Sequence, residues 1–148
     1  MSDISPGDVV EIRTHKGRAY AQVTHDHPSY PSVVRVLEGY FEDRPQDMAE
    51  LVSGQSRFTA MIPLESALTR LGREFETVGT FDIPAAISRF PTFRMPIRDK
   101  TGQIVYWWLW DGQGLSYKVD LDEAESKLPT REVMTAKRFT ELLDGTAD

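Results

Sequence analysis

The sequence lacks cysteine, long apolar runs and a leader-like start, and each absence limits the kind of protein it encodes. Without cysteine there can be no disulfides, no thiolate metal sites and no cysteine nucleophile. The longest apolar run, Ile104 to Trp110, suits one buried strand and is too short to span a membrane. Residues 1–6 contain no basic patch followed by an apolar stretch, so no secretory signal is visible. We therefore expect a cytoplasmic protein with no membrane partner.

The common catalytic motifs are also missing. The sequence contains no GxSxG elbow, no GxxxxGK[ST] loop, no strand-to-helix GxGxxG turn and no HExxH pair. The glycines in Asp111-Gly112-Gln113-Gly114 fit a hairpin turn instead. We accordingly expect a protein that is not an enzyme and needs no cofactor or metal.

Three histidines offer the one alternative to that expectation. His25 and His27 share a face of an extended segment, and His15 lies in the preceding loop. Such a group could hold a metal or supply a general base. However, Pro28 follows directly, and nothing in the sequence would orient the rings. We favour exposed loop histidines.

Basic residues are also scarce. The chain has 17 Lys and Arg against 23 Asp and Glu, a formal charge of −6. This balance argues against nucleic acid, whose affinity depends on cations that neutralise phosphates. It suits a basic protein partner, although the charge could equally serve only solubility.

The remaining composition is that of a folded protein. The chain has 148 residues, 40% of them hydrophobic and 27% charged. No repeat or obvious linker interrupts it, so we expect a single domain over residues 1–148.

The alternation of apolar and polar residues predicts mainly strands. In the first half we expect strands at 10–12, 18–23, 32–37, 57–62 and 74–81, with a hairpin turn at Gly17. In the second half the strands 93–97, 104–110 and 115–119 form a meander. The fold class is therefore α+β with a mainly antiparallel sheet and an SH3-like, barrel-type hairpin region at the N-terminus.

A few short helices complete the prediction. Met48, Leu51 and Val52 indicate one helical turn within a loop over 38–55. Leu64, Leu68 and Leu71 have helical spacing and predict a helix over 63–72, with Gly72 as its terminator. Residues 83–90 form either a short helix or an irregular segment.

The last two helices are predicted from their capping signals. Asp120 and Glu123 form a capping-box-like pair before a short helix. The final helix starts at Thr135, with Met134 and Phe139 as a hydrophobic staple, and ends at Gly145.

The aromatic strand 104–110 has two interpretations. Tyr106, Trp108 and Trp110 share one face, while Trp107 and Leu109 lie on the other. A strand that is apolar on both faces is usually central, which favours a core strand. The alternative is an aromatic platform for a ligand or protein partner.

Negative charge gathers in one stretch of the first half. Glu38, Glu42, Asp43, Asp47 and Glu50 stand against the single base Arg44. A smaller acidic run follows at 120–125. Such runs are either solvated surface or a recognition patch for a cationic partner.

Two N-terminal segments carry a family resemblance. The stretch from Pro6 to Ile12, with its Gly-Asp before a strand, and the stretch from Gly17 to Val23 resemble the opening of the bacterial immunity protein 26 family. The Trp-rich strand within 102–112, which ends in Asp-Gly, is similar in placement. The resemblance implies a small cytoplasmic protein that neutralises a polymorphic toxin by binding it, with no catalytic residues.

The leading hypothesis is therefore an immunity protein that binds a protein partner, such as a basic toxin domain. The expected partner-binding residues are the acids Glu42, Asp43, Asp47 and Glu50, with Tyr40 and Trp110 as anchors. The alternative is an SH3-like adaptor or regulatory module that binds a peptide or small ligand through aromatics of the first hairpin region.

Overall fold

A computed structural model describes residues 4–129 and 135–145, which form two compact units. The large unit comprises residues 1–88 and 133–148, and the small unit comprises residues 89–132. Each unit has its own sheet. The expectation of a single domain stays a prediction, because two compact units are compatible with one domain or two.

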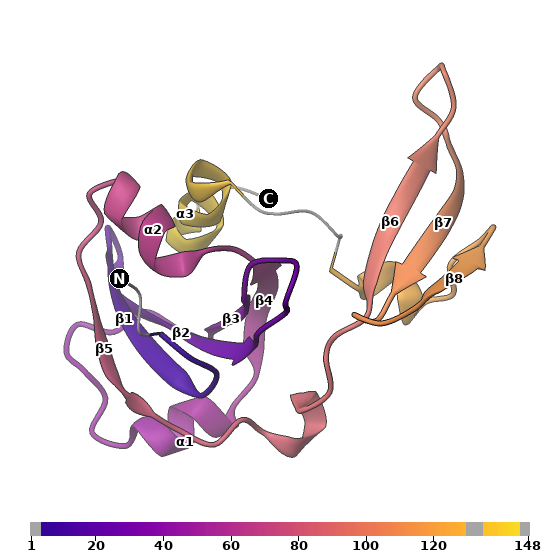
Figure 1. Ribbon diagram of the computed structural model, residues 1–148. Coiled ribbons are helices and arrows are strands. Elements are labelled where there is room, and N and C mark those ends of the chain that lie inside the picture. The colour runs from indigo at the N-terminus through magenta and orange to yellow at the C-terminus, as the bar shows by residue number, and fades with distance from the viewer. Residues whose placement is uncertain (1–3, 130–134, 146–148) are drawn as a thin grey trace. The chain divides into compact units, whose positions relative to one another are not determined.

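The large unit is built on a five-stranded antiparallel sheet (Figure 1). Its strands are β1 (Asp8–Thr14), β2 (Gly17–His25), β3 (Val33–Leu37), β4 (Ser56–Met61) and β5 (Phe75–Thr80), in the order β4-β3-β2-β1-β5. The predicted antiparallel α+β class is confirmed. The SH3-like barrel is not confirmed, because β4 and β5 remain the two edges of this sheet and do not pair with each other.

Two helices cover one face of this sheet (Figure 1). They are α2 (Leu64–Arg70) and α3 (Ala136–Asp144). Alternate strand residues such as Val10, Ala21 and Val34 are fully buried against Leu68 and Phe139 from these helices. The alternating apolar residues of the strands and the apolar face of an amphipathic helix thus form one core, as the two sequence patterns predict.

The helix ends agree only partly with their sequence signals. Thr135 caps α3 by accepting from Arg138 N at 3.1 Å, and Gly145 ends it with φ 75°. The Met134 staple lies outside the described residues. Leu64 and Leu68 are buried, whereas α2 ends at Arg70, so Leu71 lies beyond the helix and is 45% exposed.

The opposite face of the sheet is covered by α1 (Met48–Ser53) and the segment before it. Met48 and Val52 of α1 pack against Val9, Tyr20 and Leu37 of the sheet. This confirms the predicted helical turn. The same sheet face also buries Glu11, Gln22 and Arg35, so α1 lies over polar as well as apolar side chains.

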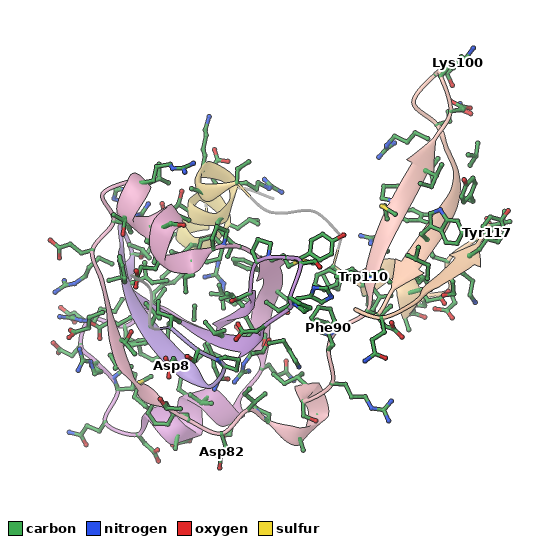
Figure 2. The ribbon with its side chains drawn as sticks, viewed as in Figure 1. Asp8, Asp82, Phe90, Lys100, Trp110 and Tyr117 are labelled. Carbon is green, nitrogen blue, oxygen red and sulfur yellow. The ribbon has the colours of Figure 1, made fainter. Side chains whose placement is uncertain are left out.

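The small unit is a three-stranded antiparallel sheet with the predicted meander order. Its strands are β6 (Phe93–Arg98), β7 (Ile104–Trp110) and β8 (Leu115–Lys118). The aromatic strand β7 is buried only at its end, at Leu109 and Trp110, whereas Ile104 and Val105 are exposed. Figure 2 shows Phe90 beside Trp110, and their ring centroids lie 5.5 Å apart.

Two single 3-10 turns are found in the remaining segments: one within 83–90, where the sequence leaves both a short helix and an irregular segment open, and one after Asp120, where it predicts a short helix. The large unit has η1 (Ala85–Ile87) and the small unit has η2 (Glu125–Lys127). The predicted Asp120–Glu123 cap is wrong, because the reciprocal pair is Asp122 and Glu125: Glu125 N donates to Asp122 Oδ1 at 2.8 Å, and Asp122 N donates to Glu125 Oε1 at 3.1 Å. Lys118 Nζ lies 3.3 Å from Glu125 Oε2, and this ion pair favours the capping pair that lies two residues later than predicted.

The described helices are all short. Among residues 4–129 and 135–145, none is long and apolar enough to cross a membrane.

Candidate functional site

The segment before α1 is fixed to the sheet by Arg18. Arg18 N donates to Phe41 O at 2.7 Å, and Phe41 N donates to Arg18 O at 2.9 Å. The Arg18 guanidinium also donates from Nη1 to the carbonyl oxygen of Glu42. Gly17 permits this close approach, because a Cβ there would lie 2.8 Å from Phe41 O. The backbone at Phe41 and Glu42 is therefore held against β2 while the carboxylate of Glu42 is exposed.

Arg44 is a second anchor of the same segment. Its Nε donates to Glu11 Oε2 at 2.8 Å, and its Nη2 donates to Glu76 Oε1 at 2.7 Å. The Tyr20 hydroxyl also donates to Glu11 Oε2, at 2.8 Å. The hydrogen bond from Arg44 is the main cause that holds the pKa of Glu11 below its usual value. Burial, followed by the Glu11 carboxylate, raises the pKa of Tyr20.

Arg35 is the third anchor and lies beneath the C-terminal end of α1. Its side chain is 2% exposed, and burial lowers its pKa. Nε donates to Gln22 Oε1 at 3.0 Å, Nη1 donates to Gly54 O at 3.2 Å, and Nη2 donates to Val52 O. These carbonyls are the unpaired acceptors at the end of a helix, where a cation is favourable. Arg35 therefore stabilises α1 on the sheet through an amide oxygen and backbone carbonyls.

The three anchored points shape a groove of about 320 Å³ along α1. Its apolar lining comes from Phe41, Pro45 and Leu51. Its acidic lining comes from Glu38, Asp47 and Glu50, all exposed. We call this the acidic groove; Gly54 and Gln55 complete its lining. An aromatic and aliphatic floor beside carboxylates can accept the stem and the charged head of a Lys or Arg side chain.

The acidic charges around the groove are not neutralised within the described part of the chain. Over residues 4–129 and 135–145, no ion pair involves the five acids of this stretch: Glu38, Glu42, Asp43, Asp47 and Glu50. The stretch's own base, Arg44, is paired with Glu11 and Glu76. One oxygen of Asp47 caps α1 by accepting from Glu50 N at 3.0 Å. The groove therefore presents a negative surface to solvent.

The structure brings together only some of the predicted partner-binding residues. Asp47 and Glu50 line the groove, and Glu42 and Asp43 are exposed on the segment that leads into it. Tyr40 instead donates from its hydroxyl to Leu143 O at 2.7 Å, at the end of α3. Trp110 belongs to the small unit, where it is 6% exposed. Both aromatics therefore have packing roles within their own units.

The sequence did not single out the apolar floor of the groove. No pattern in the sequence indicates that Phe41, Pro45 and Leu51 line a binding site. Their position depends on the contacts of Arg18 with Glu42 and of Arg35 with Val52, which join residues 24 and 17 apart in sequence. The spacing of Asp47 and Glu50, three residues apart before apolar residues, is a capping signal that could have fixed the start of α1.

The histidines are in separate polar contacts. His25 Nε2 lies 2.9 Å from Ser88 O, and His27 Nδ1 accepts from Ser29 N at 3.0 Å. His15 is exposed in the β1–β2 turn. In the part of the chain that the structure describes, no group of three or more His, Asp or Glu residues could hold a metal ion. His27 and Tyr30 line a crevice of about 560 Å³ beside α2.

Comparisons with known proteins give no relative from which a role could be transferred. Neither protein-family models, nor curated proteins, nor solved structures gave a match to this chain. The resemblance to the immunity protein 26 family stays a prediction.

Proposed function

We propose that this chain is an immunity-type protein that neutralises a toxin by binding a basic segment of it in the acidic groove. The observation that carries the proposal is the apolar floor at Phe41 and Leu51 beside the exposed carboxylates of Asp47 and Glu50. These carboxylates form no ion pair within the described residues. The resemblance of the N-terminal segments to immunity proteins supports the same class.

The physical basis is electrostatic complementarity followed by occlusion. A toxin that handles nucleic acid needs Lys and Arg at its substrate surface. The acidic groove would attract these side chains and accelerate encounter, and contacts with the apolar floor would prolong the complex. Nothing in this mode of action requires a reaction at the groove.

The experiment uses a toxin encoded beside the gene for this chain. The neighbouring gene is expressed in a bacterial host with and without the chain, and growth is measured. We expect the chain to relieve growth arrest, and the quadruple variant Glu42→Gln, Asp43→Asn, Asp47→Asn and Glu50→Gln to protect less. Asn at 47 keeps an N-cap acceptor, so α1 should be preserved.

A control for charge removal elsewhere is the variant Glu74→Gln with Asp82→Asn, which neutralises two exposed acids of the large unit outside the groove. It should protect as well as the wild type. If no neighbouring gene product arrests growth, or if the quadruple variant protects fully, the proposal is wrong.

One observation favours a second candidate, a peptide-binding module. The crevice beside α2 combines the rings of His27 and Tyr30, 5.1 Å apart, with Pro31 and Pro63. Apolar, aromatic clefts of this kind suit extended peptides. Selection from a peptide library would test it: a binder whose affinity falls with Tyr30→Ala and not with Asp47→Asn would favour this module.

A further inference from the structure

The two edges of the small sheet differ in how they are protected. On the β6 edge, Arg94 N donates to Pro129 O at 2.9 Å, so this outward N–H is already used. Two residues along, Pro96 has no N–H to offer. In an antiparallel pair, outward and inward groups alternate, so Pro96 lies where its missing donor faces away from β7. The β6 edge is therefore closed to a further strand.

The β8 edge is open. Asp111 N donates to Gly114 O at 3.3 Å, so these two residues form a hydrogen-bonded pair at the start of the β7–β8 hairpin. Because hydrogen-bonded and non-hydrogen-bonded pairs alternate along antiparallel strands, Ser116 and Lys118 direct their backbone N–H and C=O groups toward β7. Leu115 and Tyr117 therefore direct theirs outward. Their side chains, and that of Val119 just after the strand, are 54%, 55% and 56% exposed. An apolar edge with outward backbone donors and acceptors is a template for another strand.

The side chains beside this edge form an aromatic surface. Tyr117 lies 5.0 Å from Tyr106 and 6.0 Å from Trp108, measured between ring centroids. All three project from the same face of the sheet, because Trp108 is the register partner of Tyr117 and Tyr106 lies two residues along β7. Figure 2 marks Tyr117 on β8 and Lys100 in the β6–β7 turn, so Tyr117 can be followed at the outer strand.

We propose that two copies of this chain pair through β8, in antiparallel register about Tyr117, to form one continuous sheet. This inference goes beyond the acidic groove and does not depend on it. In this register Tyr117 lies opposite its own equivalent on the aromatic face, and Leu115 lies opposite Val119, the residue that follows β8 in the second copy. Ser116 lies opposite Lys118 on the other face, so like charges do not meet.

A second copy is the occupant that this edge fits, because its sequence is self-complementary in that register. A two-fold axis through Tyr117 pairs the same edge with itself, as an isologous dimer requires. Each apolar side chain of the edge then meets an apolar one. Pairing uses the outward donors and acceptors of both copies and leaves the closed β6 edges at the ends of the joined sheet.

The first test uses the absence of cysteine. A Tyr117→Cys variant of the full chain has a single thiol, and the proposed two-fold places it at an interstrand pair with Cα atoms about 5.5 Å apart, within disulfide range. Mild oxidation should give a covalent dimer in high yield. Val105→Cys, on an exposed β7 position away from the edge, is the control and should remain mainly monomeric. Equal, low yields for both variants would overturn the proposal.

The second test fixes the register with charges, measured by sedimentation equilibrium of the full chain. Leu115→Glu with Val119→Glu places like charges in both cross-strand pairs and should raise the dimer dissociation constant at least about tenfold. Leu115→Glu with Val119→Lys places opposite charges there and should restore most of the affinity. A wild-type chain that stays monomeric at all concentrations, or two double variants that associate equally, would contradict the pairing.

Discussion

The guanidinium of Arg44 lies 2.8 Å from the carboxylate of Glu11, from Nε to Oε2, although the two residues are far apart in sequence. This contact uses the only base of the acidic stretch 38–50 for an anchor beneath it. The same contact therefore holds the segment in place, and within residues 4–129 and 135–145 the exposed carboxylates of the stretch form no ion pair. The function that we propose for the acidic groove follows from this arrangement, in which Arg44 is paired beneath the segment and the acids face solvent.

The Glu11 contacts predict an acid-sensitive component of stability. The pKa of Glu11 is below its ordinary value of 4.5 in the folded chain, chiefly because Arg44 donates to it. Stability from this group is therefore fully present above about pH 4.5 and is lost as the pH falls through the lower folded-state pKa. We expect Glu11→Gln to lower the free energy of unfolding at pH 7 by about 1–3 kcal/mol.

Urea unfolding of the two proteins from pH 7 down to pH 3 measures this effect. The difference between them should shrink as the pH falls below 4.5. A difference that stays constant over that range would show that ionised Glu11 contributes nothing.

Arg35 should be irreplaceable by lysine. Its guanidinium contacts Gln22 and the carbonyls of Val52 and Gly54 at once, and a lysine has one ammonium on a flexible stem. We expect Arg35→Lys to lower the free energy of unfolding by about 1–3 kcal/mol, because buried carbonyls at the end of α1 lose their donor.

Chemical denaturation gives the magnitude, and the exposed Arg70→Lys is the matched control. If both substitutions cost equally little, Arg35 does not stabilise α1.

The attachment of α3 to the sheet should depend on Arg73 and Asp144. Arg73 donates from Nη1 to Asp144 Oδ1 at 2.7 Å and from Nη2 to Oδ2 at 2.9 Å, and both side chains are largely buried. When one side chain of such a bidentate ion pair is removed, the folded chain loses more stability than when both are removed, because the remaining charge is left buried and unpaired. Arg73→Ala should cost about 1–3 kcal/mol of unfolding free energy.

A double-mutant cycle with Asp144→Ala measures the coupling. We expect the double variant to be less destabilised than the sum of the single variants. Strict additivity would show that the two side chains act independently.

The sequence predicted the strands well and the helix positions less well. Val10, Ile12, Ala19 and Ala21 alternate with polar residues, and all four are buried on one face as period two requires. Helix boundaries depend on local competition that the sequence leaves open. Asp120–Glu123 and Asp122–Glu125 have the same spacing, and the ion pair from Lys118 favours the second.

The acidic stretch could be recognised from the sequence, but the groove could not. The exposed acids Asp47 and Glu50 stand out as a charge run, whereas the groove also needs Phe41 and Leu51 in place. These depend on arginines that look like ordinary surface residues in the strands 18–23 and 32–37. Arg35, which is almost fully buried, is the clearest case, because a charged residue within a strand suggests a solvent-facing position.

The groove should bind a basic peptide without any toxin present. In an NMR titration with a tri-arginine peptide, we expect the largest shifts at the amides of Glu50, Leu51 and Gly54. Asp47→Asn with Glu50→Gln should weaken binding about twofold to thirtyfold, since two exposed charge pairs contribute about 0.2–1 kcal/mol each. Shifts spread evenly over the acidic surface, unchanged in the variant, would indicate non-specific attraction.

The rate at which the chain associates with its toxin, measured by stopped flow at increasing salt, tests the central claim most directly. We expect the wild type to associate fast, with a rate constant that falls steeply as salt is added. We expect the variant Asp47→Asn with Glu50→Gln to associate more slowly, with a rate constant that depends less on salt. The control Glu74→Gln with Asp82→Asn should follow the wild type more closely. If the groove variant keeps the wild-type rate and salt dependence, the acidic groove is not where the partner binds.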